Sequence, residues 1–217
     1  MSDLEFGEAI LTMTQSFSAA IERIKRLPSG RWLFFRRALV HPLQLGTPIP
    51  SSPALGRLIA MHLADRKNGL TVEIGGGTGV ITRQLLAAGV SPDRLLVLEI
   101  DPQMADYLRG TLPEARVVTG DARNLSQLLP PSWRGRVDTI VSGVPMAVLT
   151  AAYQREIIDA MFGVLAPDGR YLQYTFTLGG SPVRARRLGL AGRRLGTTFG
   201  NFPPASVWTY RPAAEKA

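Results

Sequence analysis

The stretch Val72-Glu73-Ile74-Gly75-Gly76-Gly77-Thr78-Gly79 decides how this chain folds. The apolar run at 70–74 is typical of a buried strand, and the pattern over residues 79–88 predicts a helix directly after the glycines. A glycine-rich turn in that position is where α/β sheets bind nucleotides, because glycine lets the backbone approach a ligand closely. The stretch therefore predicts the nucleoside-binding loop of an α/β domain.

Two acids near the loop indicate which kind of nucleoside it accepts. Glu73 precedes the first glycine, where a carboxylate repels phosphate and attracts a cation. Glu99 ends the second apolar run, residues 95–99, and is placed to accept hydrogen bonds from both hydroxyls of a ribose. An anionic pyrophosphate is disfavoured, and a cationic nucleoside fits.

Apolar runs and helical stretches alternate through the rest of the middle region. Beyond the first two strands, we expect helices at 102–110 and 151–165 and strands at 115–118, 137–141 and 170–177. Pro167-Asp168-Gly169 predicts a turn just before the last of these strands. Strands that alternate with helices predict parallel βαβ units and a doubly wound α/β sheet.

The composition excludes several classes of protein. The 217 residues contain no cysteine and two histidines, which excludes a disulfide framework and a thiolate zinc site, and we expect no metal centre. No apolar stretch approaches the roughly 18 residues of a membrane span. Acids at positions 3, 5 and 8 argue against a signal peptide, so we expect a cytoplasmic protein.

Residues 1–46 differ in pattern from residues 47–217, which we expect to form the α/β domain. Apolar side chains recur at intervals of three and four and predict one side of an amphipathic helix: Phe6, Ile10, Met13, Phe17 and Ile21. A basic cluster without acids begins there with Arg23, Lys25 and Arg26, in a chain of net charge +8. The segment either packs on a core or lies in the headgroup region of an anionic membrane, and such basic clusters also suit nucleic acid or stay solvated.

The motif Glu73-x-Gly75-x-Gly77-x-Gly79, with Glu99 one strand later and Gly120-Asp121-Ala122 after the third strand, resembles the S-adenosylmethionine-dependent methyltransferases of class I. The resemblance covers residues 47–178 and implies a Rossmann-like sheet of seven strands, with S-adenosylmethionine as cofactor and S-adenosylhomocysteine as product. It assigns the cofactor contacts to Glu73, Gly75, Gly77, Gly79, Glu99, Ile100, Asp121, Ala122 and Ser142. In that family Asp121 would accept a hydrogen bond from the adenine amino group, although Gly-Asp is also an ordinary turn signal.

The whole chain resembles the small bacterial phospholipid N-methyltransferases, through residues 46–52, Ser142-Gly143-Val144-Pro145 and residues 201–208. That family converts phosphatidylethanolamine stepwise toward phosphatidylcholine, and its N-terminal helix binds the membrane. The resemblance implies a phospholipid substrate and a peripheral place on the inner leaflet of the cytoplasmic membrane. It leaves the oligomeric state open.

Two other functions are weighed against this one. A looser resemblance to the ribosomal RNA adenine dimethyltransferases runs through the same core. However, Ser142 stands where methyltransferases of nucleobase amines carry an amide or an acid, and no aromatic residue follows Pro145 to stack a flipped base, so nucleic acid is disfavoured. The third function is that of a non-enzymatic membrane-binding or remodelling protein, against which the cofactor acids argue.

Six further residues are candidates for substrate contacts or for closing the cofactor pocket. Tyr174 and Tyr153 would orient the amine by a hydrogen bond or a ring face, or else Tyr174 only fills a face of the sheet. Arg184 and Arg187 would bind the lipid phosphate through their planar guanidinium groups, or else form a solvated or membrane-facing basic surface. Ser51 and Ser52 either close the cofactor pocket or cap a helix that begins after Pro53.

Overall fold

The computed structural model describes residues 51–66, 68–176, 180–201 and 203–213, all of which belong to the compact unit Pro50–Ala217. The expected amphipathic helix lies outside the described residues, and so do its members Phe6, Ile10, Met13, Phe17, Ile21, Arg23, Lys25 and Arg26. No helix among the described residues is long and apolar enough to cross a membrane.

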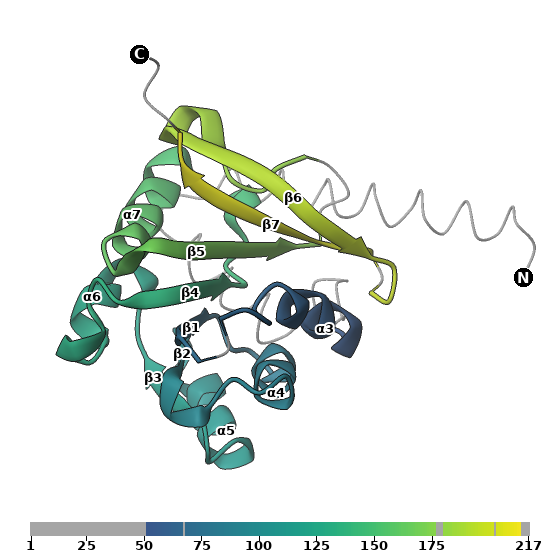
Figure 1. Cartoon of the computed structure of the whole chain (residues 1–217), viewed down its shortest axis with the longest axis vertical. Helices are drawn as coiled ribbons and strands as arrows, with labels where there is room; N and C mark the ends of the chain where they lie inside the picture. Colours follow the sequence, from purple (N-terminus) through teal and green to yellow (C-terminus); the bar gives the residue numbers. More distant parts are fainter. Residues whose placement is uncertain (1–50, 67, 177–179, 202, 214–217) are drawn as a thin grey trace, which may run out of the picture. The chain divides into compact units, whose positions relative to one another are not determined.

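One sheet of seven strands forms the centre of this unit. The strands are β1 (Leu70–Ile74), β2 (Leu95–Glu99), β3 (Arg116–Thr119), β4 (Val137–Ser142), β5 (Leu165–Thr175), β6 (Leu190–Thr198) and β7 (Ala205–Pro212). Their order is β3-β2-β1-β4-β5-β7-β6 (Figure 1). The strands from β3 to β5 are parallel, whereas β7 runs antiparallel to both of its neighbours. The doubly wound sheet predicted from the sequence is confirmed.

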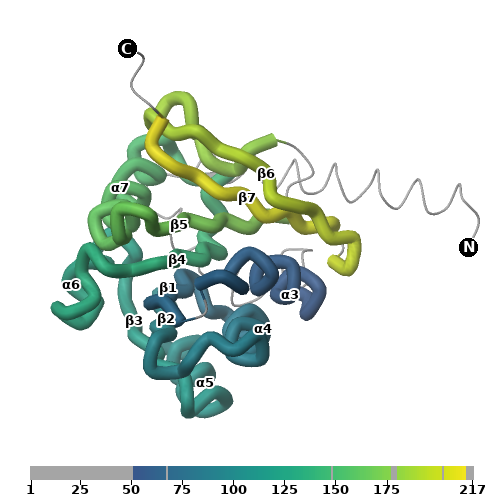
Figure 2. The backbone as a smooth tube through the Cα atoms, viewed as in Figure 1, coloured from purple at the N-terminus to yellow at the C-terminus, as the bar shows by residue number. Residues whose placement is uncertain are grey.

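Helices cover both faces of the sheet. The longer ones are α3 (Pro53–Met61), α4 (Val80–Ala87), α5 (Pro102–Thr111) and α7 (Ala151–Phe162), and a short α6 (Leu125–Leu128) follows β3. Figures 1 and 2 show α3 and α4 on one side of the strands and α6 and α7 on the other. Each side has its own hydrophobic core cluster, which we call the α4 layer and the α7 layer.

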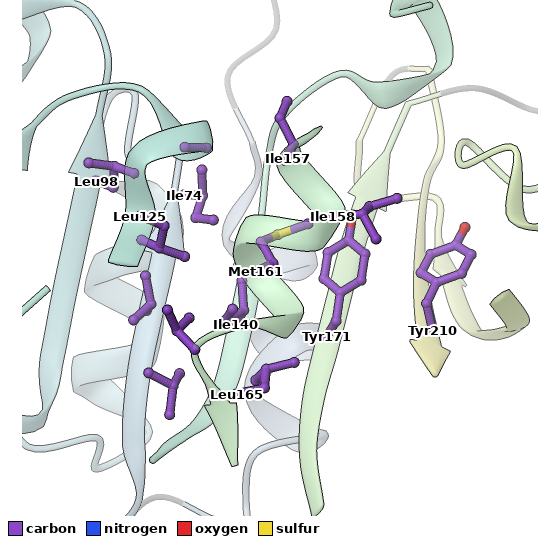
Figure 3. Packing of buried hydrophobic residues seen from close by; sticks show 14 of the residues in the cluster. Ile74, Leu98, Leu125, Ile140, Ile157, Ile158, Met161, Leu165, Tyr171 and Tyr210 are labelled. Carbon is purple, nitrogen blue, oxygen red and sulfur yellow. The ribbon is translucent and has the colours of Figure 1, made fainter. Parts of the chain in front are cut away.

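Both layers are built on strands that are buried on their two faces, as in other parallel sheets. Every residue of β2 is buried, and β1 is buried from Thr71 onward. Figure 3 shows the α7 layer, in which Met161 and Ile158 of α7 lie against Ile140 of β4 and Tyr171 of β5. The Tyr171 ring lies 5.4 Å from the Tyr210 ring of β7, which joins the antiparallel strands to this core.

The fifth strand begins earlier than predicted. The helix expected over 151–165 ends at Phe162, and β5 begins at Leu165 rather than at Arg170. Residues 167–169, which the sequence predicts as a turn, therefore lie inside β5. Val137 pairs with Leu165 and Thr139 pairs with Arg170, so the intervening residues bulge outward while both ends keep their pairing.

Candidate cofactor and substrate site

The carboxyl ends of β1, β2 and β4 meet at one edge of the sheet, which we call the carboxyl edge. The loop after β1 turns there with φ values of 83° at Gly75, 54° at Gly77 and 77° at Gly79, in the left-handed region that favours glycine. A Cβ at Gly77 would meet no atom within 4 Å, so the backbone at this position borders open space. The loop is therefore shaped to bring its main chain against a ligand.

Glu99 is fixed against this loop by two main-chain hydrogen bonds. The Gly77 N–H donates to its Oε2 at 2.9 Å, and the Asp101 N–H donates to its Oε1 at 3.0 Å. The side chain is buried, at 5% exposure. An ionised carboxylate has about four lone-pair sites, so about two remain for the hydroxyls of a ligand. Ile100, the next residue, is half-buried at the same edge.

Glu73 is a fully buried carboxyl group, and only one of its two oxygens has a hydrogen-bond partner among the described residues. Its Oε2 accepts a hydrogen bond from Thr82 Oγ1 at 2.8 Å, whereas its Oε1 has no hydrogen-bond partner among the described residues. Burial raises the pKa of Glu73 to about 8, and the charge of Glu99 adds to the increase. A cation placed beside Glu73 would stabilise its ionised form.

Asp121 lies beyond β3 in a cluster with Arg123 and Tyr153. The Arg123 Nη2 and Nε donate to Asp121 Oδ2 at 2.7 and 3.0 Å, and the Arg123 N–H donates to Oδ1 at 2.9 Å. Burial by itself would raise the pKa of Asp121, but these bonds outweigh it and lower the pKa. The Arg123 guanidinium also covers the Tyr153 ring at 4.5 Å from its centroid. Ala122, beside Asp121, is buried.

The loop after β4 is held by two buried glutamines that the sequence analysis did not identify. Gln173 of β5 donates from Nε2 to the carbonyls of Ser142 at 3.0 Å and Val144 at 2.8 Å. Gln154 of α7 donates to the Met146 carbonyl at 2.6 Å. Nothing in the sequence marks these two residues, because their role depends on carbonyls that only the fold brings near them.

The side chain of Tyr174, from β5, lies over Gly143, the residue directly after β4. An ideal Cβ built on Gly143 would lie 2.2 Å from the Tyr174 hydroxyl oxygen, so the ring occupies the space that a side chain at 143 would take. Burial raises the pKa of Tyr174, the charges of Glu73 and then Glu99 also raise it, and a hydrogen bond with the Ser51 side chain lowers it. The Tyr174 hydroxyl therefore lies in the field of both predicted cofactor acids.

Tyr153, the other tyrosine predicted to contact the substrate, does not lie beside Tyr174. It packs in the α7 layer, whereas Tyr174 packs in the α4 layer on the opposite face of the sheet. Arg184 and Arg187 are exposed. Arg184 precedes the short helix Ala185–Leu188 and Arg187 lies within it, and Leu188 of this helix belongs to the α7 layer. A contact of these arginines with substrate phosphate stays a prediction.

Ser51 and Ser52 take different positions. The Ser52 hydroxyl oxygen accepts from the Leu55 N–H at 3.2 Å and so caps α3, which was one of the two predicted roles. The Ser52 N–H and hydroxyl both donate to Oδ1 of Asn201, a residue of the C-terminal stretch noted in the sequence. Ser51 contacts Tyr174 instead. The start of the described chain thus meets the connection between β6 and β7 beside the carboxyl edge.

The arrangement at the carboxyl edge suits a cationic nucleoside. Within the described residues, no group of three or more His, Asp and Glu side chains could hold a metal ion. The buried and half-satisfied Glu73, the fixed carboxylate of Glu99 and the open glycine loop lie together at the carboxyl edge. This is the position in which open α/β sheets bind their ligands.

Comparison with known proteins agrees with this geometry. Residues 72–169 match the family described as a methyltransferase domain. The ornithine lipid N-methyltransferase of Singulisphaera acidiphila is 35% identical over 148 residues, which make up 66% of this chain and 77% of that protein.

Two solved structures share the fold at low sequence identity. One is an O-methyltransferase from Bacillus cereus in complex with SAH, with a TM-score of 0.58, 16% identity and coverage of 81% of this chain and 89% of that one. The other is a TehB-like methyltransferase from Corynebacterium glutamicum, with a TM-score of 0.52, 22% identity and coverage of 72% and 87%. With its fold, its glycine loop and its relative in lipid methylation, the chain belongs to the class I S-adenosylmethionine-dependent methyltransferases.

Proposed function

We propose that this methyltransferase transfers methyl groups from S-adenosylmethionine to the primary amine of a membrane lipid. The observation that carries the proposal is the 35% identity to an ornithine lipid N-methyltransferase, which extends over 77% of that relative. Phosphatidylethanolamine, the substrate implied by the sequence, and ornithine lipid both present an amine on a lipid anchored in a membrane. We take phosphatidylethanolamine as the first substrate and expect the enzyme to work at the membrane surface.

The carboxyl edge would hold the cofactor, which supplies a methyl group on a positively charged sulfur. Glu99 would accept the ribose hydroxyls with its free lone pairs, and Glu73 would face the positive charge with its unpartnered oxygen. Asp121 and Ala122 would contact the adenine, and Ser142 would border the same pocket. The main chain at Gly75, Gly77 and Gly79 would come close to the cofactor.

Tyr174 is the residue that we propose to orient the lipid amine. The lipid ammonium has to release one proton to solvent before its nitrogen lone pair can attack the methyl carbon. An acceptor that holds a remaining N–H then points this lone pair along the line of transfer. Because the pKa of Tyr174 is raised, its hydroxyl stays neutral and can accept a hydrogen bond from the amine. Tyr153 is less suited, since the Arg123 guanidinium already covers its ring.

Replacing Tyr174 by phenylalanine should reduce turnover roughly a hundredfold, in the range seen for positioned acid–base groups. Cofactor affinity and vesicle binding should stay within twofold of the wild type, because the ring and its packing remain. Tyr107→Phe is the matched control, because Tyr107 is half-exposed on α5. Unchanged turnover in the Tyr174 variant would remove this residue from the reaction.

The substrate class is tested by following the methyl group. The full chain is incubated with methyl-labelled cofactor and with one of three acceptors: phosphatidylethanolamine vesicles, ornithine lipid vesicles or a structured RNA. Label in a lipid fraction supports the proposal and identifies the lipid. Label in RNA alone would replace the proposal with the nucleic-acid alternative.

A further inference from the structure

The helix α3 packs beside β6 and β7, at the antiparallel end of the sheet (Figure 1). A Cβ built on Gly200 would lie 2.7 Å from the Ala54 Cβ, and one on Gly196 would lie 3.0 Å from the Leu58 side chain. Farther along, the charge of Arg193 acts on His62. We call four of the exposed residues along this contact, Arg57, Met61, Arg193 and Phe199, the α3–β6 ridge.

The α3–β6 ridge carries most of the large apolar side chains that the described residues expose. Phe199 is 83% exposed and Met61 is 72% exposed, and Tyr107 on α5 is the third and last such residue in the described part of the chain. Phe199 lies beside the start of α3, because its neighbour Gly200 adjoins Ala54, and Met61 is the last residue of that helix. Each end of the ridge therefore presents one large apolar side chain to solvent, as a surface that enters the headgroup boundary does. Phe199 lies in the turn between β6 and β7, where its side chain projects into solvent.

The charge of the ridge is positive. Neither Arg57 nor Arg193 forms an ion pair among the described residues, whereas Arg170 nearby is paired with Asp65 at 2.7 Å. Burial lowers the pKa of His62, and the charges of Arg193 and Arg170 lower it further. A surface with unpaired arginines and projecting apolar side chains complements an anionic lipid headgroup layer above hydrocarbon.

The ridge ends at the same edge of the sheet as the cofactor site. Thr175 of β5 pairs with Ser206 of β7, and Ser206 pairs with Thr197 of β6, so Phe199 lies just past the carboxyl edge. A groove of about 440 Å³ beside it is lined by Phe199, Arg194, Thr197 and Ser206. The Thr197 and Ser206 hydroxyls hydrogen-bond each other at 3.1 Å, so the exposed guanidinium of Arg194, which lies over the Trp208 ring, is the donor there that suits a phosphate. A membrane against this end would therefore lie near the reacting groups.

We propose that the α3–β6 ridge docks on an anionic lipid bilayer, with Phe199 entering the headgroup boundary and Arg57 and Arg193 contacting lipid phosphates. The inference rests on the proposed function, because only a lipid substrate requires the carboxyl edge to face a bilayer. All four residues of the ridge belong to the unit Pro50–Ala217, so the ridge does not include the amphipathic segment predicted within residues 1–46.

The test uses the full chain and sedimentation with vesicles of phosphatidylglycerol and phosphatidylcholine, compared with pure phosphatidylcholine. Phe199→Ser should weaken binding to the anionic vesicles about fivefold to tenfold. Arg57→Glu with Arg193→Glu should weaken it more than tenfold at low salt, and the difference should shrink at high salt. Tyr107→Ser and Arg116→Glu, exposed substitutions on α5 and on the opposite edge strand β3, are the matched controls and should bind as the wild type does.

Measurements of turnover distinguish a failure of the ridge proposal from a failure of the proposed function. Phe199→Ser should lose turnover on lipid in vesicles and keep it on the same lipid dispersed in detergent. If the wild type methylates neither form, the proposed function fails, while the vesicle series still decides the ridge. If Phe199→Ser and the double arginine variant both bound vesicles as the wild type does, the proposal for the ridge would be overturned. The proposal would also be overturned if these variants changed their oligomeric state and bound vesicles as before. That result would assign the surface to a second copy of the chain.

Discussion

Replacing Gly143 by alanine is expected to reduce methyl transfer about a hundredfold or more, through a single added methyl group. The new Cβ would lie 2.2 Å from the Tyr174 hydroxyl oxygen and 2.7 Å from its Cζ, so the ring has to leave its place over β4. Displacing a positioning group by about 1 Å costs on the order of a hundredfold in rate. Gly143 does not have the positive φ that favours glycine, so the effect would come from the ring and not from strain of that kind.

The measurement is turnover on lipid vesicles, together with cofactor affinity by calorimetry and a thermal melt. Gly110→Ala is the matched control, because a Cβ at Gly110 would meet no atom within 4 Å. The expected pattern is lost turnover with a folded, cofactor-binding protein. Turnover within twofold of the wild type would show that the position of the Tyr174 ring does not matter.

Glu73→Gln should change the pH dependence of both stability and cofactor binding. With a folded pKa of about 8 and an ordinary unfolded value of 4.5, Glu73 keeps a proton in the folded state that the unfolded chain has released. Stability therefore falls as the pH rises from about 4.5 to about 8, by up to several kcal/mol. Glutamine has no such proton, so the variant should gain stability relative to the wild type across this window.

Urea unfolding at pH 5 and pH 9 measures this difference, with the exposed Glu114→Gln as control. Cofactor binding gives a second readout, since a positively charged ligand favours the ionised form of Glu73. Affinity for S-adenosylmethionine should rise as the pH approaches 8 in the wild type and not in the variant, while affinity for neutral S-adenosylhomocysteine should change little. Parallel profiles for wild type and variant would mean that Glu73 does not titrate in this range.

Much of the sheet could be predicted because its signals are local. The strand, glycine loop and helix around Gly75 follow one another in the sequence, and Glu99 ends the next apolar run. Parallel strands bring their carboxyl ends to one edge, so chain order alone predicts that these acids lie near the loop. The helices α4 and α5 accordingly begin within one residue of their predicted starts.

The antiparallel end of the sheet could not be predicted in the same way. β6 contains Gly192, Gly196 and two exposed arginines, and as an edge strand it lacks the apolar run that marks a buried one. The pairing of Ser142 with Gln173, which carries Tyr174 over Gly143, depends on the register between β4 and β5. The bulge inside β5 sets that register, and no local pattern reports it.

Long-range contacts account for what the sequence left open about the candidate site. The two predicted tyrosines look equivalent in sequence, but α7 carries Tyr153 to one face of the sheet and β5 carries Tyr174 to the other. Ser52 caps α3 and also donates to Asn201, which is 149 residues away in the sequence. Contacts between residues so far apart in the sequence form only once the whole sheet is assembled, so no local pattern predicts them.

The central claim is that the carboxyl edge holds S-adenosylmethionine with Glu99 on the ribose, and calorimetric titration of Glu99→Ala tests it most directly. The account predicts a loss of about 1.5–3 kcal/mol of binding free energy, as for hydrogen bonds to a charged group. Glu114→Ala, an exposed substitution of the same kind, should bind as the wild type does, and a thermal melt of each variant confirms that it is folded. Wild-type affinity in a folded Glu99→Ala protein would contradict the claim.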